Sequence, residues 1–561
     1  MTAGLPQNPD EVLWMKRTTG FSDALLRFDF SAVSATTGET TPSMPGVTTM
    51  WLGTIARGVW EPGRALGIFG GPSFAQSEVG LHLAQLAVAA ATSILIGLFV
   101  FLAWRWAGAI AAIAAGALLA TEPFVVFQGS MLHTDELEGL FAATGTIAFL
   151  LALGVPDGGA SRPRAMASLA GALLAGAFLS KLSALLLVPG LAAIIGWACV
   201  RAVRQEKAPS RGSLAAMRPV ARLVGIVLAA AIATTLLAWP ALWADPVDQL
   251  SSLRRSGEIG GRGHLQFFLG EVTDTPGPLY YLVSIPFKMT PWFLLGMLAV
   301  IAAAVVRSTQ TRLAAVALVA LPALISLSFA SKQIGRYALA VLPLMALAVG
   351  LGLDALWTLI RRRRLLRQRD PSVRRIAPLA AGSLLALMLA HSMWVAPWGT
   401  AYFNPILGGG SAAESKIIVA GTYGHDRAGE VIREREAPEC AVTIGAFSAW
   451  APESLYPCGS VERIRRVSDL GAGLDYVVVL SDYRQRFPDV ASALRASGRT
   501  VAEAKLWGAT NAEIIEVDPA RASRSQPQVG DGGAAATGVD APRAGGGDAE
   551  SPGPAASGYQ R

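Results

Sequence analysis

Residues 80–103 read GLHLAQLAVAAATSILIGLFVFLA, a run of 24 residues without a single aspartate, glutamate, lysine or arginine. About 20 predominantly apolar residues are enough for a helix to cross the hydrocarbon core of a bilayer. This run therefore predicts a transmembrane helix. Nine further apolar runs follow it, at residues 107–127, 137–155, 166–180, 182–200, 223–243, 290–306, 313–330, 338–360 and 377–397. Together they predict an α-helical polytopic membrane protein with about ten transmembrane helices.

The composition supports a membrane protein. Hydrophobic residues make up 52% of the chain and charged residues only 16%, with a mean hydropathy of +0.44. A soluble protein usually carries about a quarter charged residues. The net charge of +7 could indicate a nucleic-acid partner, but the arginines cluster in short loops between apolar runs. Basic loops of this kind set membrane topology, so we expect no nucleic acid to bind.

Alternate loops between the apolar runs differ in their basic residues. One set holds 19 lysines and arginines, whereas the other holds seven, although it includes the much longer loop 244–289. Cytoplasmic loops carry the excess of basic residues, so the second set and both termini are predicted to be extracytoplasmic. Residues 1–79 begin with nothing that resembles a signal peptide or a first transmembrane helix. We therefore expect either an upstream transmembrane helix missing from this reading frame, or translocation of this segment by the first span.

These features predict four regions. Residues 1–79 form an external segment with amphipathic helices and an acidic pair. Residues 80–400 form the transmembrane domain, with its long external loop at 244–289. Residues 401–517 contain short apolar runs at 416–420, 440–444 and 476–480, which are typical of strands, and predict a small extracytoplasmic α/β domain. Residues 518–561 are rich in Gly, Ala, Ser, Pro and Asp, a composition that predicts a disordered tail.

Two of the three cysteines lie in the predicted small domain. Cys440 and Cys458 are separated by 17 residues. Because an extracytoplasmic compartment permits disulfides, the topology predicts a bond between them. Closing a loop of this size is worth about 3 kcal/mol in the chain-entropy model. Two unpaired cysteines, one buried and one in a turn, are the alternative.

Charged and polar residues next to the ends of the spans are the candidates for chemistry. On the predicted external side these are Asp10, Glu11, Glu122, His133, Asp135, Glu136, Lys181, Lys332, Arg336 and Tyr337. Structural roles stay open for several of them. The acids at 135 and 136 could complement a helix dipole behind Thr134, and Lys181 could extend to the bilayer surface. Lys332 and Arg336 oppose the orientation rule, which favours a functional role.

The order of these motifs resembles that of the membrane-embedded glycosyltransferases of the C superfamily. The likeness is strongest to the protein mannosyltransferase-like family that includes bacterial aminoarabinose transferases, and it covers about residues 9–415. Its motifs here are the acidic pair at 10–11, the stretch Phe21 to Asp29, PGVTTMWLG at 45–53, Glu122-Pro123, LHTD at 132–135, LSK at 179–181, PGPLYY at 276–281 and SK to RY at 331–337. Two departures are the lack of the family's first helix and Glu-Pro in place of Asp-Pro.

The resemblance implies a glycosyltransferase of the C-superfamily fold at the outer face of the cytoplasmic membrane. Such enzymes move a sugar from a polyprenyl phosphate to an acceptor hydroxyl on protein, lipid or glycan. Asp10, or less strongly Glu11, is then the base. The remaining candidates fall into three groups: a donor-phosphate site of Lys181, Lys332, Arg336 and Tyr337, a substrate pocket of Tyr280 and Tyr281, and an acceptor or divalent-metal site of His133, Asp135, Glu136 and Glu122.

Two other functions fit parts of the sequence. A transporter or flippase for a lipid-linked substrate also carries charged residues beside its spans, but usually shows two matching halves, and none are visible here. A membrane scaffold leaves the external charges unexplained. Convergence of Asp10, Asp135 and Arg336 on one external site favours the enzyme, whereas scattered positions favour the scaffold.

Overall fold

The computed structural model describes residues 9–30, 45–205 except 157 and 159, 213–261, 263–362, 371–420, 423–448, 451–470 and 473–525. Within these residues, seven helical stretches are long and apolar enough to cross a membrane. They are α3 (Glu78–Ala107), α6 (Asp135–Leu153), α7 (Pro163–Ser180), η2 with α8 (Leu182–Leu187 and Val188–Gln205), α9 (Ser213–Ala238), α14 (Arg307–Ser328) and α15 (Leu342–Arg362). The chain is therefore a helical polytopic membrane protein.

The other three predicted spans also fall on helices, but on irregular ones. α4 (Ala109–Thr121) and α13 (Pro291–Val305) are shorter than a full span. α16 (Pro371–Val395) is followed by a second helical stretch at an angle of 100°, and this bent pair counts as at most one span. The described residues thus contain seven spans, or eight with the bent pair, and the predicted count of about ten is not confirmed.

Helix α6 lies at the centre of the bundle. In its apolar window 89% of the residues are buried, against 11% in that of α9. Glycines allow the close packing that membrane helices need. A Cβ added to Gly139 of α6 would lie 2.1 Å from the carbonyl oxygen of Leu339 in η3 (Gly335–Ala340). η3 therefore packs against the first turns of α6, which brings Arg336 beside Asp135.

Residues 9–30 and 45–79 pack onto the end of the bundle at which α6 begins. α1 (Pro9–Leu26) packs on α2 (Val47–Ala65), and η1 (Phe74–Gln76) leads into α3. The side chains of Trp14, Phe21 and Trp60 are fully buried in these contacts. The predicted long loop contains α10 (Pro240–Ala244), α11 (Pro246–Gly261), an antiparallel pair β1 (Gln266–Phe268) and β2 (Glu271–Thr273), and α12 (Tyr280–Lys288).

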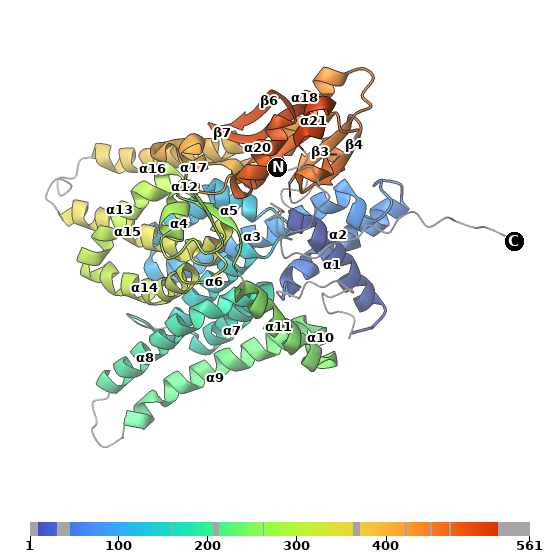
Figure 1. Cartoon of the computed structure of the whole chain (residues 1–561). Helices are drawn as coiled ribbons and strands as arrows, with labels where there is room; N and C mark the ends of the chain where they lie inside the picture. The colour runs from blue at the N-terminus through green and yellow to red at the C-terminus, as the bar shows by residue number, and fades with distance from the viewer. Residues whose placement is uncertain are drawn as a thin grey trace, which may run out of the picture.

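The C-terminal region is an α/β domain, as predicted. Its five-stranded sheet has the order β4-β3-β5-β7-β6, parallel between β4, β3 and β5 and antiparallel beyond. The strands are β3 (Thr443–Phe447), β4 (Ser460–Ile464), β5 (Tyr476–Leu480), β6 (Gly498–Leu506) and β7 (Ala509–Val517). The helices are α17 (Gly409–Glu414), α18 (Tyr423–Glu436), α19 (Ser481–Arg486), α20 (Pro488–Ala496) and α21 (Pro519–Ser525). Figure 1 shows this domain at one end of the molecule, with α8 and α9 projecting from another side.

Both faces of this sheet are covered. Val478 and Ile514 belong to one buried cluster, whereas Val477 and Ile515 belong to another, as expected for alternating side chains on a strand. The predicted strand at 416–420 is wrong, because only Ile417 forms an isolated bridge there, with Phe268. The predicted tail begins too early, since α21 occupies part of it. Residues 526–561 lie outside the described residues.

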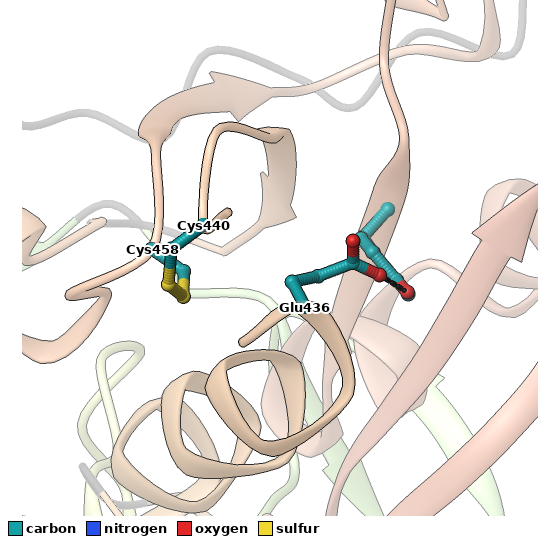
Figure 2. The surroundings of a disulfide bond; sticks show 4 residues. Glu436, Cys440 and Cys458 are labelled. Atoms are coloured by element: carbon teal, nitrogen blue, oxygen red, sulfur yellow. Dashed lines mark hydrogen bonds between the residues drawn. A yellow bond between two sulfur atoms is a disulfide. The ribbon is translucent and has the colours of Figure 1, made fainter. Parts of the chain in front are cut away.

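Cys440 and Cys458 form a disulfide in the structure, with their Cα atoms 4.6 Å apart. Figure 2 shows the bond beside the end of α18, near Glu436. Cys440 precedes β3 and Cys458 precedes β4, two neighbouring parallel strands. The bond therefore links the segments that lead into two neighbouring strands of the sheet.

Candidate active site

Five ionisable side chains from distant parts of the chain meet at one end of the bundle: Asp10, His133, Asp135, Lys181 and Arg336. We call them the acidic cluster. Arg336 bridges the two aspartates, with Nη2 at 2.7 Å from Oδ2 of Asp10 and Nε at 3.2 Å from Oδ2 of Asp135. Asp10, Asp135 and Arg336 thus converge on one site, the arrangement that favours an enzyme over a scaffold.

Histidine 133 also contacts both aspartates. Its Nε2 atom lies 3.2 Å from Oδ2 of Asp10, and its Nδ1 atom lies 2.8 Å from Oδ2 of Asp135. The indole ring of Trp14, one turn after Asp10 on α1, meets the imidazole edge-on at 6.5 Å between ring centres. The imidazole is therefore fixed from three sides and holds Asp10 in place.

Lysine 181 completes the cluster from the end of α7. Its Nζ atom donates a hydrogen bond to Oδ1 of Asp135 and lies 3.7 Å from the centre of the Tyr337 ring. The predicted PG segment holds this residue, since Pro45 and Lys181 form a β-bridge and the hydroxyls of Thr48 and Ser180 are 2.7 Å apart. The structure thus gives this motif a role in positioning Lys181.

These contacts decide which charges the residues of the acidic cluster carry. Burial alone raises the pKa of Asp10, but Arg336 and His133 outweigh it and hold that pKa well below its usual range. Burial lowers the pKa of Lys181, yet Asp135 outweighs it and the net shift is upward. The pKa of Arg336 is raised in the same way by both aspartates. Asp10 is therefore an ionised carboxylate, and both basic partners are cations.

The two aspartates of the acidic cluster differ in their exposure to solvent. Its side chain is 35% exposed, whereas that of Asp135 is 1% exposed. Asp135 begins α6 and contacts Lys181, His133 and Arg336. Only Asp10 of the two can be reached by a substrate, and Asp135 acts as an internal counter-ion.

The two members of the acidic pair have different environments. Glu11 is fully buried and accepts hydrogen bonds from Nε2 of Gln85 at 3.1 Å and from the backbone N–H of Leu132 at 2.9 Å. These bonds tie α1 to α3 and to the loop before α6. The structure therefore places Glu11 in a buried joint between elements.

Glu122 lies in a different polar group from the acidic cluster. Its carboxylate accepts hydrogen bonds from the backbone N–H and the hydroxyl of Thr290. Close by, the amide of Asn404 donates to the carbonyl of Met289 at 2.7 Å, and Lys288 donates to the carbonyl of Thr400 at 2.8 Å. We call Glu122, Lys288, Thr290 and Asn404 the Glu122 node.

The remaining predicted residues lie beside the cluster or away from it. Tyr280 and Tyr281 are buried, 5.1 Å apart between ring centres, and the Tyr281 hydroxyl donates to the carbonyl of Ile334. Glu136 is buried next to Gly129. Lys332 is partly exposed, and the described part of the chain offers it no ion pair or hydrogen bond.

Two residues near the cluster belong to none of the motifs found in the sequence. His264 precedes β1, and Arg486 ends α19 in the C-terminal domain. Both are electrostatically coupled to this region: Arg486 acts on His264 and Tyr280, and the charges of Arg336 and Asp10 act on His264. Only the fold brings them here, because they come from a loop and from a separate domain.

A divalent metal was a sequence alternative for His133, Asp135, Glu136 and Glu122. In the described ranges, no group of three or more His, Cys, Asp or Glu side chains is arranged to hold a metal ion. The carboxylates of Asp10 and Asp135 are occupied by Arg336 and Lys181. Asp135 of the predicted metal set is thus paired with cations, and Glu122 lies in a separate polar group with Thr290.

No protein-family model and no curated protein matches the chain. Solved structures are similar at low identity. ArnT from Cupriavidus metallidurans in the apo state has 15% identity and a TM-score of 0.45, and covers 93% of this chain and 95% of its own. The archaeal oligosaccharyltransferase AglB from Archaeoglobus fulgidus has 14% identity and a TM-score of 0.37, covering 82% of this chain and 64% of its own.

A third similar structure is the arabinofuranosyltransferase AftD from Mycobacteria, with 15% identity and a TM-score of 0.33. It covers 92% of this chain and 40% of its own length. Two of these three proteins are named as transferases of sugars, the class that the sequence motifs resemble. Because all three TM-scores are below 0.5, the function is inferred from the acidic cluster alone.

Proposed function

We propose that this protein is an inverting glycosyltransferase at the outer face of the cytoplasmic membrane, with a polyprenyl-phosphate sugar as donor. The observation that carries the proposal is the state of Asp10. It is an ionised, partly exposed carboxylate, fixed by Arg336 and His133 at the end of a membrane bundle. A general base needs this combination of charge, reach and fixed position.

The reaction follows from this geometry. The acceptor hydroxyl on a protein, lipid or glycan places its oxygen behind the anomeric carbon and gives its proton to Asp10. A new oxygen–carbon bond forms while the bond from that carbon to the phosphate oxygen breaks. The electron pair leaves with the polyprenyl phosphate. Because the attack and departure are on opposite sides, the anomeric configuration inverts.

The cations have two tasks in this proposal. Arg336 and His133 keep Asp10 ionised and oriented while it accepts the proton. Arg336, with Lys332 and with Lys181 under the Tyr337 ring, also supplies positive charge for the departing phosphate. Tyr280 and Tyr281, which are buried against each other, belong to the substrate pocket in this proposal. The polyprenyl chain lies along the apolar helices, and its phosphate lies at their outer ends.

The test is incubation of the purified protein in nanodiscs with a panel of polyprenyl-phosphate sugars and acceptor hydroxyls. The proposal predicts acceptor-dependent release of polyprenyl phosphate, detected by mass spectrometry. A protein that moves lipid-linked sugars across vesicles without releasing lipid phosphate would instead be a flippase or transporter. That result contradicts the proposal.

A further inference from the structure

The acidic cluster holds its own cations tightly. Arg336 is shared between Asp10 and Asp135, and Lys181 pairs with Asp135. Two carboxylates thus already face these two cations. A donor phosphate that arrives beside them needs positive charge that the carboxylates do not neutralise.

Such charge lies around His264. Burial, together with the nearby charges of Arg486 and Lys332, lowers the pKa of His264 to about 3, so this imidazole is neutral at pH 7. Lys332 has no ion-pair partner in the described ranges of the chain. The positive charges of Arg486 and Lys332 are therefore felt at a neutral imidazole that also feels Arg336 and Asp10 of the cluster.

Arg486 has spare hydrogen-bonding capacity. Its side chain is 17% exposed, and its Nη1 atom forms an ion pair and a long hydrogen bond, 3.4 Å, with Oδ2 of Asp482, which leaves its other N–H groups for a ligand. Its Nε atom is buried, without a hydrogen-bond partner among the residues that the structure describes. A guanidinium offers five N–H donors, and anions bind such groups in pairs of hydrogen bonds.

Packed contacts bring the C-terminal domain to this point. Helix α19 contacts β1 of the long loop. Next to it, the backbone N–H of Leu269 donates to the carbonyl of Lys416 at 2.8 Å. The Phe268 ring of β1 lies 5.5 Å from that of Tyr280. A Cβ on Gly335 would lie 3.9 Å from the Tyr280 hydroxyl, and Gly335 immediately precedes Arg336.

We propose that Arg486 of the C-terminal domain binds the donor phosphate together with Lys332, beside His264. This inference rests on the proposed function and refines it, because Arg336 is then mainly the residue that positions Asp10. It also makes the C-terminal domain a part of the donor site. As the bond to the sugar breaks, negative charge grows on the phosphate, and these two cations stabilise it.

The experiment measures binding of undecaprenyl phosphate to the full-length protein in nanodiscs of neutral lipid. Arg486→Gln and Lys332→Gln should each raise the Kd about tenfold, the effect of one lost charged hydrogen bond. Arg486→Lys should recover part of the affinity. Arg499→Gln is the matched control, because Arg499 is in the same domain, 74% exposed and paired with Glu516. The control should bind like the wild type.

Steady-state kinetics with donor and acceptor varied separately sharpen the result. Arg486→Gln should raise the KM for the donor and leave that for the acceptor unchanged. A change confined to the acceptor KM assigns the site to an anionic acceptor and overturns the inference. Wild-type affinity in both Arg486→Gln and Lys332→Gln also overturns it, while the proposed function stands if the wild type still transfers sugar. A wild type that neither binds the lipid phosphate nor transfers sugar overturns both.

Discussion

The acidic cluster and the Glu122 node are both polar groups at the ends of membrane helices, yet they differ in what surrounds their carboxylates. In the cluster, Asp10 and Asp135 face Arg336 and Lys181. In the node, Glu122 accepts only from the N–H and hydroxyl of Thr290, with no ion-pair partner among the described residues. In the cluster the neighbouring cations keep the carboxylate of Asp10 ionised, so that it can take a proton. In the node the carboxylate of Glu122 has only neutral donors and joins elements of the fold.

The difference also concerns access. Asp10 keeps a third of its side chain exposed, whereas Glu122 is 1% exposed. The Glu122 node joins the end of α4 to the junction of α12 and α13 and to the segment after α16. The same residue type therefore performs chemistry in one place and joins helices in the other, and the following variants test this division.

Asp10→Asn should have the largest effect. Removing a general base typically lowers kcat by about 10²–10⁴-fold, and asparagine keeps the size of the side chain and can still contact Arg336. Transfer rates with a saturating donor, together with the thermal unfolding temperature, separate chemistry from folding. Glu122→Gln serves as the control acid. Turnover near that of the wild type in Asp10→Asn would remove Asp10 from the role of base.

Arg336→Gln should change the pH profile of the reaction. The wild type, whose Asp10 pKa lies well below its usual range, should show no acid limb from Asp10 above pH 4. Without the cation of Arg336, burial of Asp10 is less opposed, so its pKa rises and the acid limb of kcat/KM moves to higher pH, into the measured range. Measurement of kcat/KM from pH 4 to pH 9 in wild type and variant checks this. A uniform loss of rate with an unmoved acid limb would mean that Arg336 does not control the ionisation of Asp10.

These residues show how far the sequence could be interpreted. The order of the motifs and the basic residues that oppose the orientation rule were enough to name Asp10, Asp135 and Arg336 as the residues whose convergence would decide between an enzyme and a scaffold. The sequence could not separate Asp10 from Glu11, because the partners of Glu11 are Gln85 and a backbone N–H 121 residues away. Hydrogen bonds to neutral groups leave no charge pattern in a sequence.

Lys288→Met should alter how stability depends on pH. Burial lowers the pKa of Lys288 to about 7 from its ordinary 10.5, despite its hydrogen bond to Thr400. Between these two values the unfolded chain binds a proton that the folded chain lacks, so stability rises with pH through this window and falls as the pH drops towards 7. From pH 7 to pH 9.5 the unfolding temperature in detergent should rise less in the variant than in the wild type. An equal rise in both proteins contradicts the expectation.

Glu122→Gln should have the smallest effect. The side-chain oxygen of glutamine can still accept the two hydrogen bonds of Thr290, so transfer activity and stability should stay close to those of the wild type. Glu122→Ala should instead cost about 1–3 kcal/mol, because it leaves buried donors unsatisfied. The two variants are compared in the same transfer and unfolding assays. A large loss of activity in folded Glu122→Gln would place Glu122 in the chemistry and break the division between the two groups.

The fold was predictable where a single physical rule dominates. Apolar runs located the seven spanning helices of the described residues and α13, but could not show that Pro123 begins a new helix, α5 (Pro123–Gln128), and leaves α4 short. In the C-terminal domain β5 was visible as the apolar run YVVVL at 476–480. β6 has the mixed sequence GRTVAEAKL and was missed, because its pairing with β7 holds it in the sheet.

The measurement that tests the central claim most directly is the anomeric configuration of the transferred sugar. A polyprenyl-phosphate sugar of one defined anomer is given to the purified wild-type protein, and the glycosylated acceptor is analysed by NMR. Direct attack assisted by Asp10 predicts the opposite anomer in the product, with one polyprenyl phosphate released per sugar transferred. Retention of the donor's configuration would require a covalent intermediate and would contradict the assignment of Asp10 as a general base.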